Sequence, residues 1–426
     1  IDGIYFPFDM GLEQDFGALE RIEVLKGPQG TLFGRNATGG ALNIVTKDPE
    51  LDEFHGQANL TVASYPDLHA KAHVNIPLSE SAAISISPVY AETTHFIKNT
   101  SPNQRKPLEK DVSEGVRLKV RWAPAEWLDA TVGVFDIQTT APSQGLFPVS
   151  TATDLGVLLG TPRNGYEKGS DEASLDGCCD NGADNRVYYG AAKFFTPYFD
   201  VKLLGSDQFI STRTLIDFDG SGESIATFFA EDFDSDIRTA ELQLISNEES
   251  WGSEWMKWIA GAYYFDGLAG FIEPGTQLEA VLFPTAFDAV FGTTDPLLNP
   301  LRDILTVLDG LTGEPGSPPV GRLFASFVVE TKSSAAYLQS TFTLTSWLDL
   351  TLGLRYQDES REMLFSRLGA LVGDEQVSLM DRDTAQKQDG TVVGPFSSEQ
   401  TWSPKISLET RPFGEDTLIY LNYQEA

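Results

Sequence analysis

The sequence predicts an all-β protein, a transmembrane antiparallel β-barrel that follows a compact glycine-rich N-terminal segment. Three observations support this prediction. From about Phe54 onward, apolar and polar residues alternate with the period of two that a β-strand imposes. The connections between these predicted strands are alternately short and long along the chain, and the long ones are polar. Mean hydropathy is slightly negative, at -0.17, and the chain contains no apolar run near the roughly 20 residues that a membrane helix needs.

The composition narrows the class of protein. The 426 residues carry a formal net charge of -32, and the sequence pI is about 4.3. Nucleic acid is not an expected partner, because contacts to phosphates need basic surface. The acidic balance suits long solvated loops instead. The two cysteines, Cys178 and Cys179, are adjacent and cannot staple a domain of this size, so they do not identify a redox compartment.

Residues 1–50 differ from the rest and are predicted to form a separate compact unit. Glycines there permit turns with positive φ and close approach of the backbone to its neighbours. A phosphate-binding loop is disfavoured, because no Gly-Lys-Ser/Thr sequence follows these glycines. The predicted turn residues are Gly27, Pro28, Gly30, Gly34, Gly39 and Gly40.

Residues 51–426 are predicted to contain about thirteen strands. A soluble β-sandwich would show the same alternation, so the connections decide. Short connections, such as 79–81 and 345–346, alternate along the chain with long polar connections, such as 217–235 and 363–399. This alternation is expected when tight turns lie on one rim of a barrel and extended loops lie on the other. Only a closed sheet satisfies every backbone group in lipid. The clearest alternating runs are residues 116–122, 127–134, 238–246 and 347–357.

Aromatic residues gather near the ends of the predicted strands. Ordinary core packing would explain any one of them, but it explains their clustering beside short turns less well. Aromatic girdles at the two membrane interfaces are therefore expected. The residues concerned are Trp122, Trp127, Tyr198, Phe199, Trp251, Trp255, Trp258, Trp347 and Trp402.

Residues 19–47, LERIEVLKGPQGTLFGRNATGGALNIVTK, strongly resemble the end of the plug domain in TonB-dependent outer-membrane receptors, and residues 1–4, IDGI, resemble the strand before it. Residues 239–244, 350–356 and 402–406 are similar to stretches of the family's barrel, in the expected order. The resemblance implies a plug inside the lumen of a 22-stranded barrel. It implies that residues 1–50 are the C-terminal part of the plug and residues 51–426 the first part of the barrel, in a fragment that lacks the start of the plug and the last strands.

The resemblance also implies a function. The family imports scarce ligands, most often ferric siderophores, across the outer membrane of Gram-negative bacteria, with energy from TonB and its inner-membrane complex. A member is a transporter and not an enzyme, needs no cofactor, and is surrounded by outer-membrane lipid and lipopolysaccharide. Cobalamin, haem and oligosaccharides remain alternative ligands. A passive porin is the alternative of a different class, but a porin has no plug, so residues 21–47 argue against it.

Charged residues are predicted to couple the plug to the barrel. Arg21, Glu23, Lys26 and Arg35 belong to the part of the plug that is expected to face the wall. Glu241, on the polar face of its strand, resembles a barrel glutamate that pairs with plug arginines in the family. An Arg21–Glu241 pair is one hypothesis, and a general network of lumen charges is the other. Buried ion pairs of this kind fix orientation more reliably than they add stability.

The long loops are expected to determine ligand choice. Oxygen-bearing residues alternate with glycines in the candidate calcium loop Asp217, Asp219, Ser221 and Glu223, although the twelve-residue pattern of an EF-hand is incomplete and a solvated acidic turn is the alternative. Residues 278–291 and 297–308 have near-helical apolar spacing and predict short helices. His69 and His73 share a strand face without forming a metal cluster.

Overall fold

The computed structural model describes residues 1–6, 18–34, 37, 39–64, 67–94, 98–99, 110–141, 172–173, 181–217, 226–272, 278–282, 321–372, 375–383, 396–412 and 417–425. Most of these residues are in strands. Within these ranges, no helix has the length and apolar character needed to cross a membrane.

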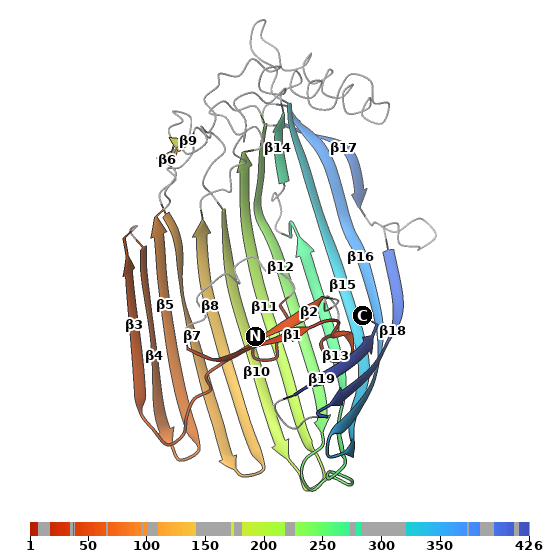
Figure 1. Ribbon diagram of the computed structural model, residues 1–426. Coiled ribbons are helices and arrows are strands. Elements are labelled where there is room, and N and C mark those ends of the chain that lie inside the picture. Colours follow the sequence, from red (N-terminus) through yellow and green to blue (C-terminus); the bar gives the residue numbers. More distant parts are fainter. Residues whose placement is uncertain are drawn as a thin grey trace, which may run out of the picture.

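One antiparallel sheet makes up the wall, and thirteen of its strands follow one another along a single path. Each neighbour in this path is also the next long strand in the sequence, so the sheet is a simple up-and-down meander (Figure 1). The predicted number of strands is confirmed for the part of the chain that the structure describes. The strands are β3 (His55–Ala63), β4 (Asp67–Ser79), β5 (Ala82–Thr94), β7 (Lys110–Ala125), β8 (Leu128–Ala141), β10 (Asn181–Phe195), β11 (Asp200–Asp217), β12 (Ala226–Ile245), β13 (Met256–Gly270), β15 (Gly321–Thr345), β16 (Leu348–Val372), β18 (Phe396–Thr410) and β19 (Ile419–Gln424).

The N-terminal residues form a small unit on the inner side of this wall. Strands β1 (Leu19–Lys26) and β2 (Gly40–Thr46) pair antiparallel, and the single-turn helix α1 (Gly30–Phe33) lies between them in sequence. In Figure 1 the β1–β2 hairpin crosses the concave face of the curved wall. The fold is therefore the predicted one, an all-β barrel wall with an N-terminal plug in its lumen.

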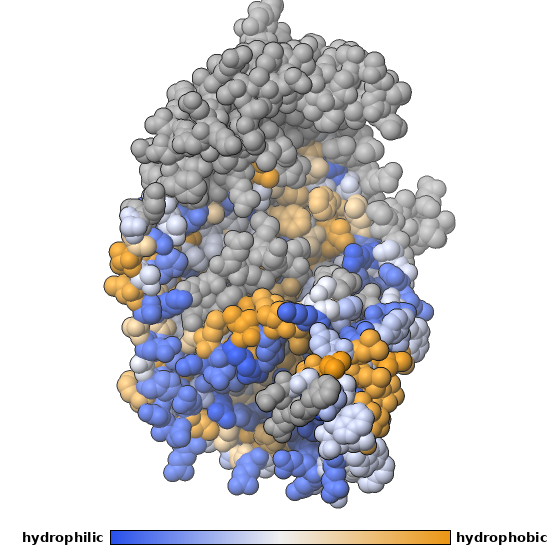
Figure 2. Space-filling model, in the orientation of Figure 1, coloured by the Kyte–Doolittle hydropathy of each residue, from blue (hydrophilic) through white to orange (hydrophobic). Residues whose placement is uncertain are grey.

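The distribution of polar side chains distinguishes this wall from a soluble β-sandwich. On β7 the polar residues Arg117 and Lys119 are buried on the inner side, whereas Val116 and Trp122 are exposed on the outer side. Other strands repeat this pattern, with exposed Leu203, Leu242, Leu338, Leu352 and Ile406. A sheet that buries its polar face and exposes its apolar face is suited to lipid. Figure 2, which looks onto the inner side, shows hydrophilic residues gathered along the turn end of the molecule.

The predicted loops are shorter than the sequence suggested. Strand β12 already begins at Ala226, inside the loop predicted at 217–235, and β16 continues to Val372, inside the loop predicted at 363–399. A further strand, β17 (Glu375–Asp383), pairs with β16. The helix predicted from residue 278 is wrong for its first five residues, because β14 (Leu278–Leu282) pairs with β12 and β15 above the end of β13. Residues 283–291 and 297–308 lie outside the described residues.

Two short strands form a separate pair at the loop end. Strand β6 (Lys98–Asn99) pairs in parallel with β9 (Glu172–Ala173). Both belong to connections between long strands of the wall, so this pairing ties two loops together at the rim opposite the tight turns.

Candidate functional site: the contact between plug and wall

A tight turn at the start of the chain fixes the carboxylate of Asp2 beside the end of β2. Asp2 and Gly3 have φ values of 51° and 84°, and Asp-Gly is favoured in turns that need positive φ at both positions. The backbone N–H of Ile4 closes the turn by donating to the carbonyl of Ile1 at 2.8 Å. One carboxylate oxygen of Asp2 accepts from the N–H of Thr46 and the other from its hydroxyl, each at 2.7 Å. The plug itself thus orients this carboxylate.

Lys119 of β7 meets the same carboxylate from the wall. Its Nζ lies 3.2 Å from Asp2 Oδ2 and 2.7 Å from Asp48 Oδ1, and it donates to the carbonyl of Thr46 at 3.2 Å. From β10, the hydroxyl of Tyr189 donates to Asp2 Oδ2 at 3.3 Å. The Lys119 side chain is only 2% exposed, so its charge depends on these partners for compensation.

The electrostatics of the site keep Asp2 ionised. Burial disfavours its charged form, but the positive charge of Lys119 and the two hydrogen bonds from Thr46 outweigh burial and hold the pKa of the Asp2 carboxyl below its usual value of 3.8. A charge-assisted contact therefore joins plug and wall at neutral pH.

A second contact combines one hydrogen bond with aromatic packing. Gln208 of β11 is fully buried, and its side-chain amide donates to the carbonyl of Tyr5 at 3.0 Å. The Tyr5 ring meets Phe265 edge to face with ring centroids 6.1 Å apart, and Phe6 meets Phe135 in the same way at 6.4 Å. These contacts hold the chain after the Asp2 turn against strands β8, β11 and β13 of the wall.

A third contact places α1 against the opposite side of the lumen. The buried Thr31 hydroxyl donates to the carbonyl of Ser403 on β18 at 3.3 Å. At the end of α1, Gly34 has a φ of 71°, and a Cβ there would lie 2.6 Å from Nη2 of Arg355 on β16. The buried Arg355 guanidinium also lies 5.7 Å from the ring centroids of both Tyr263 and Tyr337. Glycine at position 34 is thus what allows the plug to rest on this arginine.

The linker from plug to wall is fastened separately. Asn75 of β4 is fully buried; it accepts from the N–H of Glu50 at 2.9 Å and donates to the carbonyls of Glu50 and Glu53 at 2.9 and 2.6 Å. Arg121 of β7 donates to the carbonyl of Pro49 at 3.3 Å, while both its Nε and Nη2 hold the carboxylate of Asp129. The linker backbone is therefore satisfied by side chains of the wall.

Three of the charged residues that the sequence singled out, Arg21, Glu23 and Glu241, have hydrogen-bond partners close to them in the structure. The Arg21 side chain is 57% exposed and pairs with Glu23 at 2.6 Å, and Glu23 also accepts from Asn43 within the plug. Lys26 is exposed at the end of β1. On the wall, Glu241 accepts from the Tyr337 hydroxyl at 2.5 Å and from the Gln243 amide at 3.0 Å. Arg35 lies outside the described residues, and the Arg21–Glu241 pair stays a prediction.

Some of the remaining predicted residues lie in the described part of the chain, and others lie outside it. Gly27 and Gly40 have positive φ at the two ends of the β1–β2 connection; Gly30 begins α1, and Pro28 and Gly39 lie in the same connection. Of the candidate calcium ligands, Asp217 ends β11, and Asp219, Ser221 and Glu223 lie outside the described residues, as do Cys178 and Cys179. In the described part of the chain, no three His, Cys, Asp or Glu residues are placed to hold a metal ion.

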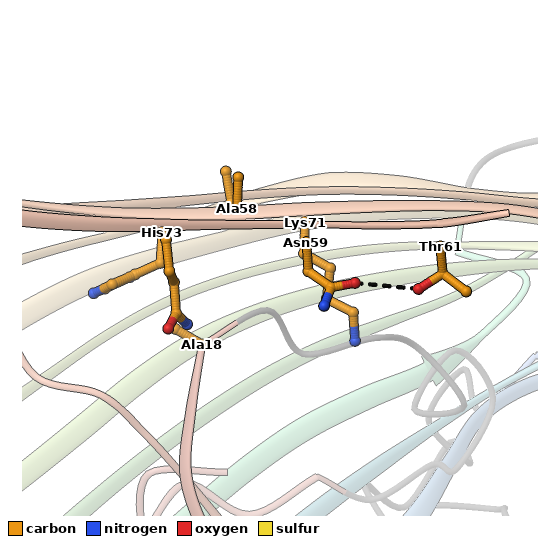
Figure 3. Close-up of a pocket in the computed structure, with 8 residues that line it drawn as sticks. Ala18, Ala58, Asn59, Thr61, Lys71 and His73 are labelled. Carbon is orange, nitrogen blue, oxygen red and sulfur yellow. Dashed lines mark hydrogen bonds between the residues drawn. The ribbon is translucent and has the colours of Figure 1, made fainter.

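A cavity of about 350 Å³ lies between the plug and strands β3 and β4. Figure 3 shows Asn59, Thr61, Lys71 and His73 directed to the side of the wall on which Ala18 of the plug lies. His73 contacts the Ser87 hydroxyl at 2.9 Å, and His69 pairs with Asp67 at 2.8 Å, so the two histidines have separate partners. Polar and apolar residues both line the cavity, and Ala18 of the plug borders it directly.

Sequence reasoning missed the wall residues that hold the plug: Lys119, Tyr189, Gln208, Arg355 and Asn75. One signal was available. Arg117, Lys119 and Arg121 place three cations at alternate positions on one face of a strand, in a chain with a net charge of -32. Cations concentrated on a lumen face indicate an acidic partner inside the barrel.

Comparisons with known proteins agree with this architecture. The TonB-dependent Receptor Plug Domain matches residues 1–41. The metal-pseudopaline receptor CntO of Pseudomonas aeruginosa is 25% identical over 162 residues, which are 38% of this chain and 21% of that protein. The iron-regulated outer membrane virulence protein of Vibrio cholerae is 35% identical over 94 residues, 20% of this chain and 14% of that protein.

The fold has solved counterparts. The ferric yersiniabactin uptake receptor FyuA from Yersinia pestis superposes with a TM-score of 0.64 at 15% identity, over 96% of this chain and 52% of that chain. The present chain therefore spans about half the length of that receptor. At this identity the likeness concerns the fold, a plug inside a barrel, and not the ligand.

Proposed function

We propose that this chain, a plug and barrel of the TonB-dependent outer-membrane receptor type, takes up a metal chelate, foremost a ferric siderophore, across the outer membrane of a Gram-negative bacterium. In this proposal, residues 1–50 are the C-terminal part of the plug and residues 51–426 the first part of the barrel. The protein is a transporter and not an enzyme. TonB and its inner-membrane complex supply the energy that moves the plug.

The observation that carries the proposal is the way in which the plug is held. Asp2, Lys119 and Tyr189 join plug and wall through charged and polar groups that can be separated and remade. Apolar packing would hold a permanently fixed plug equally well, and an open pore would need no plug. Polar contacts instead fix one resting orientation without making it irreversible.

The names of the relatives support the substrate class. Two of the similar proteins are a metal-pseudopaline receptor and an iron-regulated outer membrane protein, and the solved counterpart is a ferric yersiniabactin uptake receptor. Metal chelates are therefore the first ligands to test. A chelate also presents more polar and charged atoms than a hydrocarbon, which suits a lumen lined by polar side chains.

The test is uptake in a host that lacks its own iron-chelate receptors and expresses the full-length gene. Radiolabelled ferric chelates, haem, cobalamin and labelled oligosaccharides are supplied in turn, with and without TonB. We expect uptake of at least one ferric chelate that is lost without TonB. Uptake that persists without TonB refutes energised import, whereas TonB-dependent uptake of only cobalamin, haem or a sugar keeps the mechanism and replaces the ligand.

A further inference from the structure

The lumen face of β16 carries a continuous hydrogen-bonded row of polar side chains. Arg355, Gln357, Glu359 and Arg361 occupy alternate positions of the strand, so all four lie on one face. Arg355 Nε donates to Gln357 Oε1 at 3.2 Å, and Gln357 Nε2 donates to Glu359 Oε2 at 3.2 Å. From the other end, Arg361 Nε donates to Glu359 Oε1 at 2.9 Å. We name these four residues the β16 row.

The chemistry of the four groups determines how they are joined. A guanidinium group only donates hydrogen bonds, and a carboxylate only accepts them. The amide of Gln357 therefore has to turn its oxygen to Arg355 and its nitrogen to Glu359, as it does. Both oxygens of Glu359 are engaged, one by Gln357 and the other by Arg361. A change at one end of the row thus reaches the other end through a defined series of donors and acceptors.

The two ends of the row lie in different surroundings. Strand β16 runs from the turn end to the loop end of the wall (Figure 1), so Arg361 lies about 20 Å nearer the loops than Arg355. The Arg361 side chain is 54% exposed, whereas Arg355 is 4% exposed. At the buried end, Nη2 of Arg355 would lie 2.6 Å from a Cβ on Gly34 of the plug. The row therefore connects an exposed cation at the loop end with a contact to the plug.

The length of the row distinguishes it from ordinary bracing of a strand. Side-chain contacts between residues i and i+2 also occur on β5 and β15, as Tyr90–Glu92 and Glu330–Lys332. In the described part of the wall, each of these two examples extends over a single step along its strand. The β16 row extends over three steps and ends at the plug.

We infer that the β16 row is a relay through which an anionic group that pairs with Arg361 loosens the plug at Gly34. When Arg361 turns to that group, Glu359 loses the guanidinium at its Oε1, although its side chain is only 14% exposed. The next cation on this face is Arg355, which Gln357 already joins to Glu359. Glu359 therefore draws Gln357 and Arg355 toward the loop end, and the guanidinium withdraws from Gly34. The inference rests on the proposed import, because the anionic group would belong to the imported chelate.

The first experiment needs no ligand and is a double-mutant cycle in the full-length receptor. Arg361→Gln imitates the loss of the cation, and Gln357→Leu interrupts the row between the two arginines. The reporter is the Gly34 amide, which donates to the carbonyl of Gly30 at 3.0 Å, and its hydrogen exchange is followed by mass spectrometry. Each variant is first checked for the heat-modifiable gel mobility of a folded barrel.

We expect Arg361→Gln to raise the exchange rate of the Gly34 amide by about tenfold or more in the parent, but by less than about twofold when Gln357→Leu is already present. Arg361→Lys keeps the charge and should exchange like the parent. Arg238→Gln is the matched control and should also exchange like the parent, because Arg238 is 69% exposed and pairs with Asp207 on the outer face of the wall. An equal rise in both backgrounds, no rise at all, or an equal rise in Arg361→Lys or in the control contradicts the inference.

The second experiment tests the trigger with two ferric complexes, an anionic tris-catecholate and a neutral trihydroxamate. The anionic complex should raise exchange of the Gly34 amide in the parent and leave it unchanged in Gln357→Leu, whereas the neutral complex should change neither. The assignment of the trigger to an anionic group is wrong if the neutral complex acts equally, or if neither complex acts. Failure of the relay is distinguishable from failure of the proposed import, because the ligand-free cycle decides the relay even where no chelate is taken up.

Discussion

Removing the charge of Lys119 gives the sharpest test of how plug and wall are joined. In the variant Lys119→Met, the carboxylate of Asp2 remains buried and loses its nearest cation, which lies at 3.2 Å in the parent. Breaking one side of a buried pair costs about 3–5 kcal/mol. Asp2 retains both hydrogen bonds from Thr46, so we expect the lower end of that range.

About 3 kcal/mol corresponds to roughly a 100-fold larger population in which the plug segment is released from the wall. Hydrogen exchange measures this population directly in the full-length protein. The reporter is the amide of Thr46, which donates to Asp2 and is hidden while the contact is closed. The exchange rate of this amide should rise by roughly 100-fold in Lys119→Met. The double variant with Asp2→Asn should recover much of the protection, because the buried carboxylate that lost its cation is then neutral, and Asp48, the other partner of Lys119, is exposed to water.

Glu23→Gln is the matched control within the same plug. It removes an ion pair with Arg21 that is shorter, at 2.6 Å, but exposed to water. Exposed pairs contribute little, so the Thr46 amide should exchange as in the parent. The reasoning fails if Lys119→Met leaves the exchange rate of the Thr46 amide unchanged. It also fails if Glu23→Gln raises that rate as strongly, because burial of the ion pair would then make no difference.

Three further predictions follow from single contacts. Gly34→Ala should destabilise the plug more than Gly27→Ala, because both positions have positive φ but only at position 34 would an added Cβ lie 2.6 Å from a guanidinium nitrogen. Scanning calorimetry should show a lower unfolding temperature for Gly34→Ala, and we expect the two variants to differ by about 1–2 kcal/mol in free energy of unfolding. Asn75→Ala removes three hydrogen bonds to the linker and should cost about 2–4 kcal/mol in urea unfolding, whereas Asn59→Ala, which loses one exposed bond within its own strand, should cost under about 0.5 kcal/mol. Because the folded pKa of Asp2 lies below 3.8, its stabilising contribution is complete at neutral pH and is lost only as pH falls below about 4, so amide protection should fall there in the parent and not in Asp2→Asn.

The wall was predictable because lipid imposes a pattern on each strand separately. Runs such as residues 116–122 reveal strand, face and turn from local sequence, and the structure confirms the meander that they predict. The prediction became inaccurate where strands leave the lipid. Residues 226–235 of β12 and 363–372 of β16 continue as strands, but their sequences, ATFFAEDFDS and MLFSRLGALV, group apolar residues together, so no alternation marks them.

β14 shows a second limit of local sequence. Its five residues have apolar spacing that also suits a helix, but the edges of β12 and β15 are open above the end of β13 and offer hydrogen-bond partners. Tertiary pairing therefore overrides the local preference. A single sequence carries no record of that open edge.

The contacts between plug and wall were less predictable, since they depend on register over long separations. Asp2 meets Lys119 and Tyr189 only because β7 and β10 bring those residues to one height in the lumen. Glu241, which the resemblance singled out, accepts a hydrogen bond from the Tyr337 hydroxyl, and its pairing with Arg21 stays a prediction. Residue type predicted that charges would join the two parts, and the choice of partners required the fold.

The mixture of contacts determines how the plug can move. Separating apolar surfaces in water costs about 25 cal/mol per Å² of surface exposed, with no compensation from the solvent. Polar groups differ, because water that enters the lumen can replace their partners, and a typical hydrogen bond therefore contributes only about 1 kcal/mol net. Asp2 and the linker at Asn75 are held by polar groups, whereas Tyr5 and Phe6 pack on aromatic rings. In the proposed import, a pull on the plug would separate the polar contacts one at a time while water replaces each lost partner. The aromatic contact of Tyr5 and Phe6 has no such replacement and should resist most per unit of surface separated.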